Sequence, residues 1–438
     1  MTKAQMLIAA TSSGCGKTTF TLGLLRALRN RGLCASSFKC GPDYIDPKYH
    51  SLASGQSSIN LDPYMMSREH IREVYQRYSS EAQAVVVEGV MGLFDGYDRM
   101  QGSSASIASE LQIPVILLVN AASSAYSVGA TIYGFSHFRP EVKIAGVVFN
   151  RVASENHYHY LCDAAEDAGV PVLGYIPKSS LLEVPSRHLG LSLEELDALD
   201  AFPAQVAELI EAHVDLDRLL ELCQCPIPSF ATELTPRLQP EQGMRIAVAQ
   251  DEAFNFTYPE NLRRLAQLGE VIPFSPMRSL HLPPETTMIY LPGGYPEFYL
   301  EALERNQGLR QEIAAFAKDG GRILAECGGM MYLCREIKDQ TGKAYQMCGV
   351  LEATATMQEM KLALGYRHFE LGGKDWRGHE FHYSHLEGEQ GLKSSVVQYN
   401  LRGAAVPTGL YRNHNVVAGY THLYWAEANP LDLFTPSC

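Results

Sequence analysis

The chain has 438 residues, of which 46% are hydrophobic and 19% charged, and its formal net charge is −13. This composition is typical of a globular protein and excludes a disordered one, and an acidic chain lacks the basic face that nucleic acids and anionic membranes require. No run approaches the roughly 20 apolar residues of a membrane span, and Met6–Ala10 is too short for a secretion signal. We therefore expect a cytoplasmic protein that binds neither nucleic acid nor membranes.

Short apolar runs alternate with segments of helical period in the first half of the chain. The predicted strands are Met6–Ala10, Ala84–Glu88, Pro114–Asn120, Ile144–Asn150 and Val172–Tyr175. The segment Thr18–Arg29 is predicted to be a helix because its leucines share one face. Strands that are apolar throughout and alternate with helices are typical of a parallel α/β sheet covered on both faces.

The pattern changes in the middle of the chain. Leu191–Leu222 is acidic and has helical period, and residues 225–243 combine four prolines with polar residues, which is the composition of a linker. A second α/β set follows, with strands predicted at Arg245–Gln250, Met288–Pro292, Arg322–Glu326 and Val416–Tyr420. The sequence thus predicts two α/β domains with parallel sheets, at 1–224 and 244–438, joined by the linker 225–243.

A phosphate-binding loop follows the first predicted strand. Thr11–Thr19 has the Walker A pattern, with Thr11 in place of its first glycine. Small residues let backbone N–H groups converge on phosphate, and the start of a helix adds a favourable dipole. We expect Lys17 to reach the β and γ phosphates and the Thr18 hydroxyl to bind Mg²⁺. The ATP-binding residues predicted in this loop are Ser13, Gly14, Gly16, Lys17, Thr18 and Thr19.

Acidic residues on two further segments are candidates for the same site. Glu88 ends an apolar strand, the usual position of an acid that completes a nucleotide site, so we expect it to bind Mg²⁺ directly or through another group. Asp43 and Asp46 lie three residues apart in Phe38–Pro47, which contains two prolines. These carboxylates could hold a metal, position a substrate or belong to an ordinary turn, and the residues alone leave this open.

The second half of the chain has the residues of a thiol nucleophile site. Cys327 lies between a predicted strand and a helix, and the glycines at 328 and 329 permit the sharp turn of a nucleophile elbow. A thiol at a helix N-terminus is expected to have a lowered pKa. The backbone N–H groups of Gly294 and Gly328 are the candidate oxyanion hole, and His422 is the candidate general base.

Two other groupings have residue types of a metal site without its spacing. A single residue separates Cys223 from Cys225, which is too close a spacing for a zinc knuckle. The spacing of His379 and His382 is one residue shorter than the HExxH pattern requires. We expect these four residues to be structural.

The motifs together resemble those of the cobyrinic acid a,c-diamide synthase family. The most specific are the phosphate loop, FKCGPDYIDP at Phe38–Pro47, NLDP at Asn60–Pro63, EGVMGLFDG at Glu88–Gly96 and RHLGL at Arg187–Leu191. The resemblance runs almost from end to end. It implies a first domain similar to dethiobiotin synthetase and a second domain similar to class I glutamine amidotransferases.

The resemblance also implies a reaction and its residues. Transfer of the ATP γ-phosphoryl group would activate a carboxylate of cobyrinic acid or a related tetrapyrrole. Ammonia released from L-glutamine at Cys327 would then reach the acyl phosphate through a cavity between the domains. The residues implied for carboxylate activation are Lys39, Asp43, Asp46 and Asp95, those for Mg²⁺ are Thr18, Asp46 and Glu88, and those beside the adenine are Asn150 and Arg151. A homodimer is compatible with this reading.

Some features depart from the family pattern or leave alternatives open. Many class I enzymes have a glutamate two residues after the catalytic histidine, where this chain has Tyr424, and Ala325 replaces a usual glycine, so no third catalytic residue is assigned. Arg187 and His188 are candidates for holding substrate carboxylates. Ni-sirohydrochlorin and hydrogenobyrinic acid remain alternative substrates. The alternative of another class is a regulatory P-loop ATPase with an inactive glutaminase-like domain.

Overall fold

The computed structural model describes residues 2–179, 193–228, 235–388 and 392–435. The described residues form two compact units, one ending at Pro228 and the other beginning at Thr235. Arg187 and His188 lie outside the described residues.

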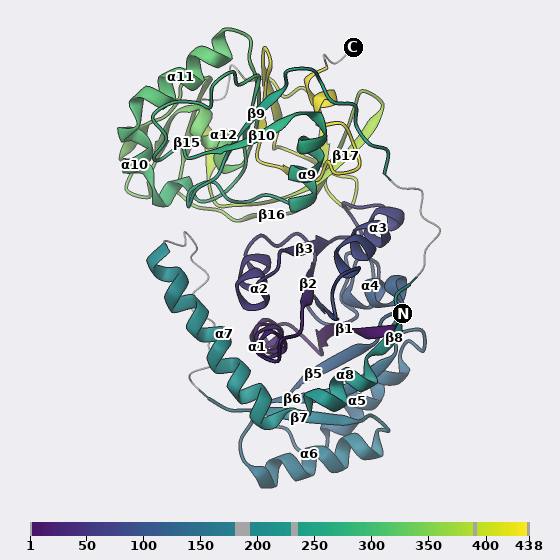
Figure 1. Cartoon of the computed structure of the whole chain (residues 1–438). Helices are drawn as coiled ribbons and strands as arrows, with labels where there is room; N and C mark the ends of the chain where they lie inside the picture. Colours follow the sequence, from purple (N-terminus) through teal and green to yellow (C-terminus); the bar gives the residue numbers. More distant parts are fainter. Residues whose placement is uncertain (1, 180–192, 229–234, 389–391, 436–438) are drawn as a thin grey trace. The chain divides into compact units, whose positions relative to one another are not determined.

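A mainly parallel sheet is the centre of the first unit (Figure 1). Its strand order is β3 (Ser58–Leu61), β2 (Ala35–Cys40), β4 (Ala84–Glu88), β1 (Thr2–Ala10), β5 (Val115–Asn120), β6 (Ile144–Val152) and β7 (Val172–Pro177). The strands β1, β2 and β4 are parallel, so their carboxyl ends meet at one edge of the sheet. The phosphate loop, Lys39 and Glu88 are therefore brought together by the topology.

Helices connect the strands of the first unit. They are α1 (Lys17–Asn30), α2 (Asp46–Ser54), α3 (Arg68–Ser79), α4 (Ser104–Leu111), α5 (Val128–His137), α6 (Glu155–Asp167), α7 (Leu193–His213) and α8 (Leu216–Leu222). The helix expected at Thr18–Arg29 is α1. The segment expected to be one helical stretch, Leu191–Leu222, contains two helices, because the Asp215 carboxylate accepts a hydrogen bond from Arg218 N and caps a new helix there.

Strand β8 (Gln224–Pro226) lies where we expected the linker to begin. It pairs antiparallel with the first residues of β1. The buried side chain of Gln5 donates to the carbonyl oxygens of Cys225 and Pro226, at 3.0 and 3.1 Å. These bonds belong to residues that the composition assigned to the linker, and they extend the first unit at least to Pro226.

The second unit contains a six-stranded sheet and two smaller ones. The larger sheet has the order β10 (Glu270–Phe274), β9 (Arg245–Ala249), β11 (Met288–Leu291), β12 (Arg322–Glu326), β22 (Val416–Gly419) and β21 (Leu410–Asn413). All its pairs are parallel except the last. The helices of this unit are α9 (Pro259–Leu268), α10 (Leu300–Arg305), α11 (Gln307–Lys318) and α12 (Gly328–Leu333), with the 3₁₀ turn η2 (Pro296–Phe298).

The two smaller sheets were not predicted. One has the order β14 (Ala344–Gln346), β13 (Cys334–Lys338), β15 (Leu351–Thr356) and β18 (His385–Glu387). The other has the order β20 (Ala405–Val406), β19 (Gln398–Tyr399), β16 (Ala363–Leu371), β17 (Lys374–His382) and β23 (His422–Leu423). The last strand, β23, contains the candidate base.

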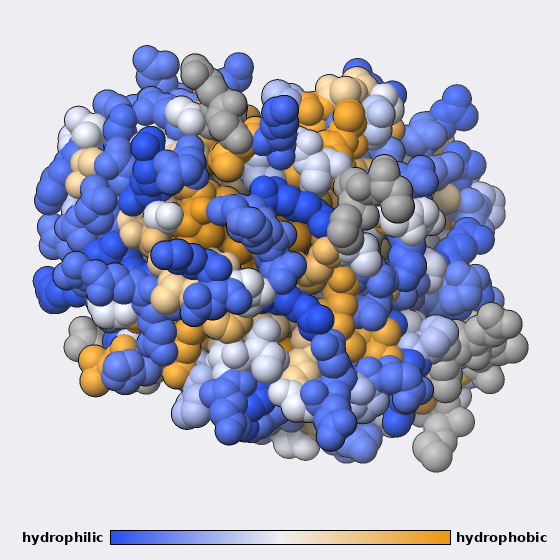
Figure 2. All heavy atoms as spheres, turned by 90° about the horizontal axis from the view of Figure 1, so that it is seen from above, coloured by the Kyte–Doolittle hydropathy of each residue, from blue (hydrophilic) through white to orange (hydrophobic). Residues whose placement is uncertain are grey.

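On the face seen in Figure 2, hydrophilic side chains cover most of the surface, with apolar atoms visible between them. Within the described ranges, no helix has both the length and the apolar composition needed to cross a membrane.

Candidate active sites

The phosphate loop connects β1 to α1. Gly16 has a φ of 92°, which strains any larger residue, and a Cβ there would lie 2.2 Å from Asn150 Nδ2, so a substitution would also displace the Asn150 side chain. Lys17 Nζ donates to the carbonyl oxygen of Met91, and burial lowers the Lys17 pKa, with the Lys39 charge adding to this effect. The three other predicted loop residues are exposed or half-buried, namely Ser13, Gly14 and Thr19.

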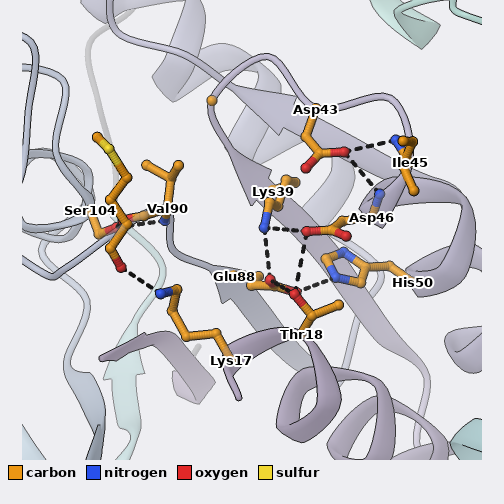
Figure 3. A network of polar contacts seen from close by, with 12 residues as sticks. Lys17, Thr18, Lys39, Asp43, Ile45, Asp46, His50, Glu88, Val90 and Ser104 are labelled. Atoms are coloured by element: carbon orange, nitrogen blue, oxygen red, sulfur yellow. Dashed lines mark hydrogen bonds and ion pairs between the residues drawn. The ribbon is translucent and has the colours of Figure 1, made fainter. Parts of the chain in front are cut away.

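A buried cluster of charged residues lies beside the loop (Figure 3). The Thr18 hydroxyl donates to Glu88 Oε1 at 2.7 Å and lies 3.4 Å from Asp46 Oδ2. Lys39 Nζ lies 2.7 Å from Glu88 Oε1 and 2.6 Å from Asp46 Oδ2. Lys39 and Glu88 are neighbours because they are paired residues of β2 and β4. The three residues expected to bind Mg²⁺ are thus in one place.

The charges in this cluster stabilise one another. Burial acts to raise the pKa of Glu88, but the Lys39 charge and the adjacent His50 hold it well below its usual range. Burial and the neighbouring Glu88 charge raise the pKa of Asp46. Lys39 has a pKa above its usual range because Glu88 and Asp46 outweigh the effect of burial. Glu88 is therefore a carboxylate held by Lys39 and His50.

Sequence reasoning missed His50, which lies in α2 and is fully buried. Its Nε2 lies 2.6 Å from Glu88 Oε2 and its Nδ1 lies 3.2 Å from Ser58 Oγ, so the ring orients the carboxylate of Glu88 (Figure 3). The sequence did contain a signal for His50, because His50 is four residues after Asp46 and residues at that spacing share one face of a helix.

Two of the acids implied by the resemblance have local backbone partners. Asp43 Oδ1 accepts from the N–H groups of Ile45 and Asp46, at 2.8 and 3.0 Å, so this carboxylate shapes the start of α2. Asp95 is exposed, and its Oδ2 accepts from Gly92 N at 3.0 Å. Asp95 therefore shapes the loop that contains Met91, whose carbonyl oxygen accepts the hydrogen bond from Lys17.

The residues expected beside the adenine lie at the end of the expected strand, which the structure continues to Val152 as β6. Asn150 Nδ2 donates to the carbonyl oxygen of Cys15 at 2.8 Å, so this side chain contacts the phosphate loop. Arg151 is exposed and has a φ of 63°. Their contact with adenine remains a prediction.

In the second unit, Cys327 stands between β12 and α12 in a strained backbone conformation. Its φ and ψ are 48° and −108°, which few residues other than glycine adopt. The conformation is held by the hydrogen bond from Cys327 N to the carbonyl oxygen of Gly419, at 2.7 Å, and by the bond from Met331 N to Cys327 O, at 3.0 Å. This is the backbone of a nucleophile elbow.

The loop after β11 lies against both the elbow and His422. A Cβ on Gly328 would lie 3.2 Å from Gly294 N, so the two glycines expected to form the oxyanion hole are neighbours. A Cβ on Gly293 would lie 2.1 Å from His422 Cε1. The imidazole of His422 is therefore packed directly on the backbone of Gly293.

The lowered pKa expected for Cys327 is wrong for this structure. Burial raises the pKa of the Cys327 thiol above its usual range, and the nearby Glu297 charge adds to this effect. The helix α12 has only six residues, and its dipole does not offset that burial. Burial also lowers the pKa of His422, with His379 and His382 adding to the effect. Both groups are therefore neutral before substrate binds, and the proton can move as the thiol attacks.

The histidines expected to be structural surround His422. The rings of His379 and His422 stack with centroids 5.1 Å apart, and the Tyr258 hydroxyl lies 3.1 Å from His379 Nδ1. His382 stacks on Tyr420 at 3.8 Å. In the part of the chain that the structure describes, no group of three or more His, Cys, Asp or Glu residues could hold a metal ion.

Two family models each match one unit of the chain, and relatives of similar length match both units. Residues 6–191 match the CobQ/CobB/MinD/ParA nucleotide binding domain, and residues 245–430 match the CobB/CobQ-like glutamine amidotransferase domain. The chain is 40% identical to the cobyrinate a,c-diamide synthase of Listeria innocua, over 97% of each chain. It is 37% identical to that of Priestia megaterium, over 98% of this chain and 96% of the relative. It is also 43% identical to the hydrogenobyrinate a,c-diamide synthase of Brucella abortus, over 88% of this chain and 90% of the relative. The chain belongs to the family of the cobyrinate and hydrogenobyrinate a,c-diamide synthases.

Proposed function

We propose that this chain uses ATP and glutamine to convert the a and c acetate carboxylates of cobyrinic acid into carboxamides. The proposal depends on one observation, which is that one chain contains both sites. They are the buried Lys39–Glu88 cluster beside the phosphate loop, and the Cys327 elbow with His422 nearby. Amidation of a carboxylate needs both an activating site and a source of ammonia, whereas a regulatory ATPase needs only the first.

In the first unit, the carboxylate attacks the γ-phosphorus of ATP, ADP leaves, and an acyl phosphate forms. Backbone N–H groups of Ser13, Gly14, Gly16 and Thr19, together with the Lys17 ammonium, bind the phosphate oxygens. Ammonia then attacks the acyl carbon and phosphate leaves. Lys39, released from part of its contact with Asp46, offsets the negative charge that the substrate carboxylate brings.

Thr18, Asp46 and Glu88 would hold Mg²⁺. Their hydroxyl and carboxylate oxygens are the hard donors that this ion prefers, and the position of the Lys39 ammonium among the same oxygens supports the proposal that a cation binds here. Bound there with the nucleotide, the ion would neutralise charge on the phosphates.

In the second unit, the Cys327 sulfur attacks the side-chain carboxamide carbon of glutamine while His422 takes the thiol proton. The N–H groups of Gly294 and Gly328 stabilise the oxyanion that forms. His422 then gives the proton to the departing ammonia. Water, deprotonated by His422, attacks the resulting thioester, and glutamate leaves as the Cys327 thiol is restored.

Mass spectrometry of the product tests the proposal. After incubation with ATP, Mg²⁺, glutamine and cobyrinic acid, we expect a product in which two hydroxyl groups are replaced by amino groups. Conversion of hydrogenobyrinic acid or Ni-sirohydrochlorin instead would keep the mechanism and change the substrate. Conversion of none of the three would refute the assignment.

Two variants separate the units. Cys327→Ser is expected to abolish ammonia release from glutamine and to retain amidation when an ammonium salt replaces glutamine. Lys17→Ala is expected to abolish ATP-dependent amidation with either nitrogen source and to retain glutamine hydrolysis. Unchanged ammonia release by Cys327→Ser would remove this cysteine from the mechanism.

A further inference from the structure

A buried glutamate connects the strand of the nucleophile to the strand of the base. Glu326 is the last residue of β12, directly before Cys327, and is 2% exposed. Its Oε1 accepts a hydrogen bond from Leu423 N at 3.0 Å, and Leu423 directly follows His422. Its Oε2 accepts from the Tyr290 hydroxyl at 2.9 Å.

This contact lies where the two strands separate. The strand β12 pairs with β22 as far as Glu326 and Gly419. The chain then leaves that sheet, because β23 pairs instead with β17 in a different sheet, with His422 opposite His379. Cys327 therefore directly follows a strand of the large sheet, whereas His422 lies in a strand of a different sheet, and backbone pairing between β12 and β22 does not extend to His422.

Side chains hold the base strand on both sides. The N–H group of Leu423 is bound by Glu326, and its carbonyl oxygen accepts from Asn261 Nδ2 at 2.8 Å. Both of these side chains are buried. Of the two, Glu326 is the chain neighbour of the nucleophile, as Leu423 is of the base, so one hydrogen bond connects the two reacting residues.

We propose that Glu326 is a positioning residue of the glutaminase site, whose side-chain hydrogen bond to Leu423 N fixes the His422 imidazole relative to the Cys327 thiol. This inference rests on the proposed roles of Cys327 and His422. In this chain Tyr424 stands where many class I enzymes have a glutamate, and Glu326 takes the orienting role in its place.

The protonation of Glu326 suits this part. Burial raises its pKa to about 8, so the neutral acid predominates at neutral pH. A neutral carboxyl group still accepts a hydrogen bond through its carbonyl oxygen. It also places no full negative charge beside Cys327, where such a charge would oppose formation of the thiolate. Glutamine has nearly the same shape and the same acceptor, so it is the conservative replacement.

Steady-state glutamine hydrolysis by the full chain tests the inference. In Glu326→Ala we expect kcat to fall on the order of 100-fold, the loss that about 1 Å of misplacement produces. KM for glutamine should stay within about twofold, since the substrate contacts are not removed. Glu326→Gln should recover kcat to within about threefold of the wild type, because the acceptor for Leu423 N returns.

Two controls separate positioning from folding. Tyr290→Phe removes the other hydrogen bond of Glu326 but leaves the bond to Leu423, so its kcat should remain within about threefold of the wild type. Amidation supported by an ammonium salt should persist in all three variants.

Wild-type kcat in Glu326→Ala would overturn the inference, as would equal losses in Glu326→Ala and Glu326→Gln, or an equal loss in Tyr290→Phe. Cys327→Ser is assayed beside them. Ammonia release retained by that variant refutes the proposed function itself, whereas an inactive Cys327→Ser with a fully active Glu326→Ala refutes only the role of Glu326.

Discussion

A single methyl group on Gly293 is expected to stop glutamine hydrolysis. The Cβ of Gly293→Ala would lie 2.1 Å from His422 Cε1, whereas ordinary contact begins at 3.4 Å, so the ring must retreat by about 1.3 Å. His422 is 1% exposed and stacks on His379, so that movement displaces the ring from its present position. Misplacement of about 1 Å in a catalytic pair costs on the order of 100-fold in rate, and we expect at least that loss in kcat.

The assay is ammonia release from glutamine, with amidation from an ammonium salt as the measure of an intact first unit. Gly308→Ala is the matched control, because Gly308 lies in α11 and its added Cβ would meet nothing within 4 Å. That variant should keep full activity and gain about 0.5 to 1 kcal/mol of stability from higher helix propensity. Retention of kcat within about threefold in Gly293→Ala would refute the argument that the position of His422 limits the reaction.

Three further predictions concern the phosphate loop, the buried cluster and pH. Gly16→Ala should weaken binding of an ATP analogue in calorimetry, because alanine is strained at the φ of 92° that the loop requires and its Cβ would displace the Asn150 side chain, whereas Gly134→Ala, with open space around its Cβ, should bind normally. His50→Ala should lower ATP-dependent amidation by about 10- to 100-fold, since Glu88 loses an orienting partner, and should leave glutamine hydrolysis unchanged; wild-type amidation would contradict this. Burial raises the Glu326 pKa from 4.5 to about 8, so its contribution to stability is complete below pH 4.5 and is lost as pH rises to about 8. Chemical denaturation should show wild-type protein losing several kcal/mol relative to Glu326→Gln over that range, at about 1.4 kcal/mol per pKa unit, and parallel pH profiles would contradict the shift.

Strands of the two main sheets could be predicted where burial on both faces leaves a continuous apolar signal. Ala84–Glu88, for example, is fully buried and was predicted from sequence with these bounds. The strand β2 was missed because its residues Ser36, Ser37 and Lys39 are polar. The side chain of Lys39 is buried only because Asp46 and Glu88 surround it, and such partners are visible only in three dimensions.

The antiparallel strands of the second unit could not be predicted for a similar reason. The strands β16 and β17 mix exposed and buried positions without regular alternation. They include polar residues such as Arg367, Glu380 and His379, which are buried in partnership with one another or with aromatic residues. Likewise, the chain neighbours of Cys327 suggested a lowered thiol pKa, but burial raises it, and the charge that adds to this effect belongs to Glu297 in η2, which is distant in sequence.

The strand β8 has a consequence for how such a chain can be assembled. It joins the end of the first unit to the start of β1, at Thr2, Lys3 and Ala4, while the phosphate loop follows the opposite end of the same strand. Entry to and exit from the unit are therefore adjacent, at the edge of the sheet remote from its chemistry. A domain with this geometry tolerates gene fusion, because a second domain attached after Pro226 is joined at the end of β1 opposite the phosphate loop.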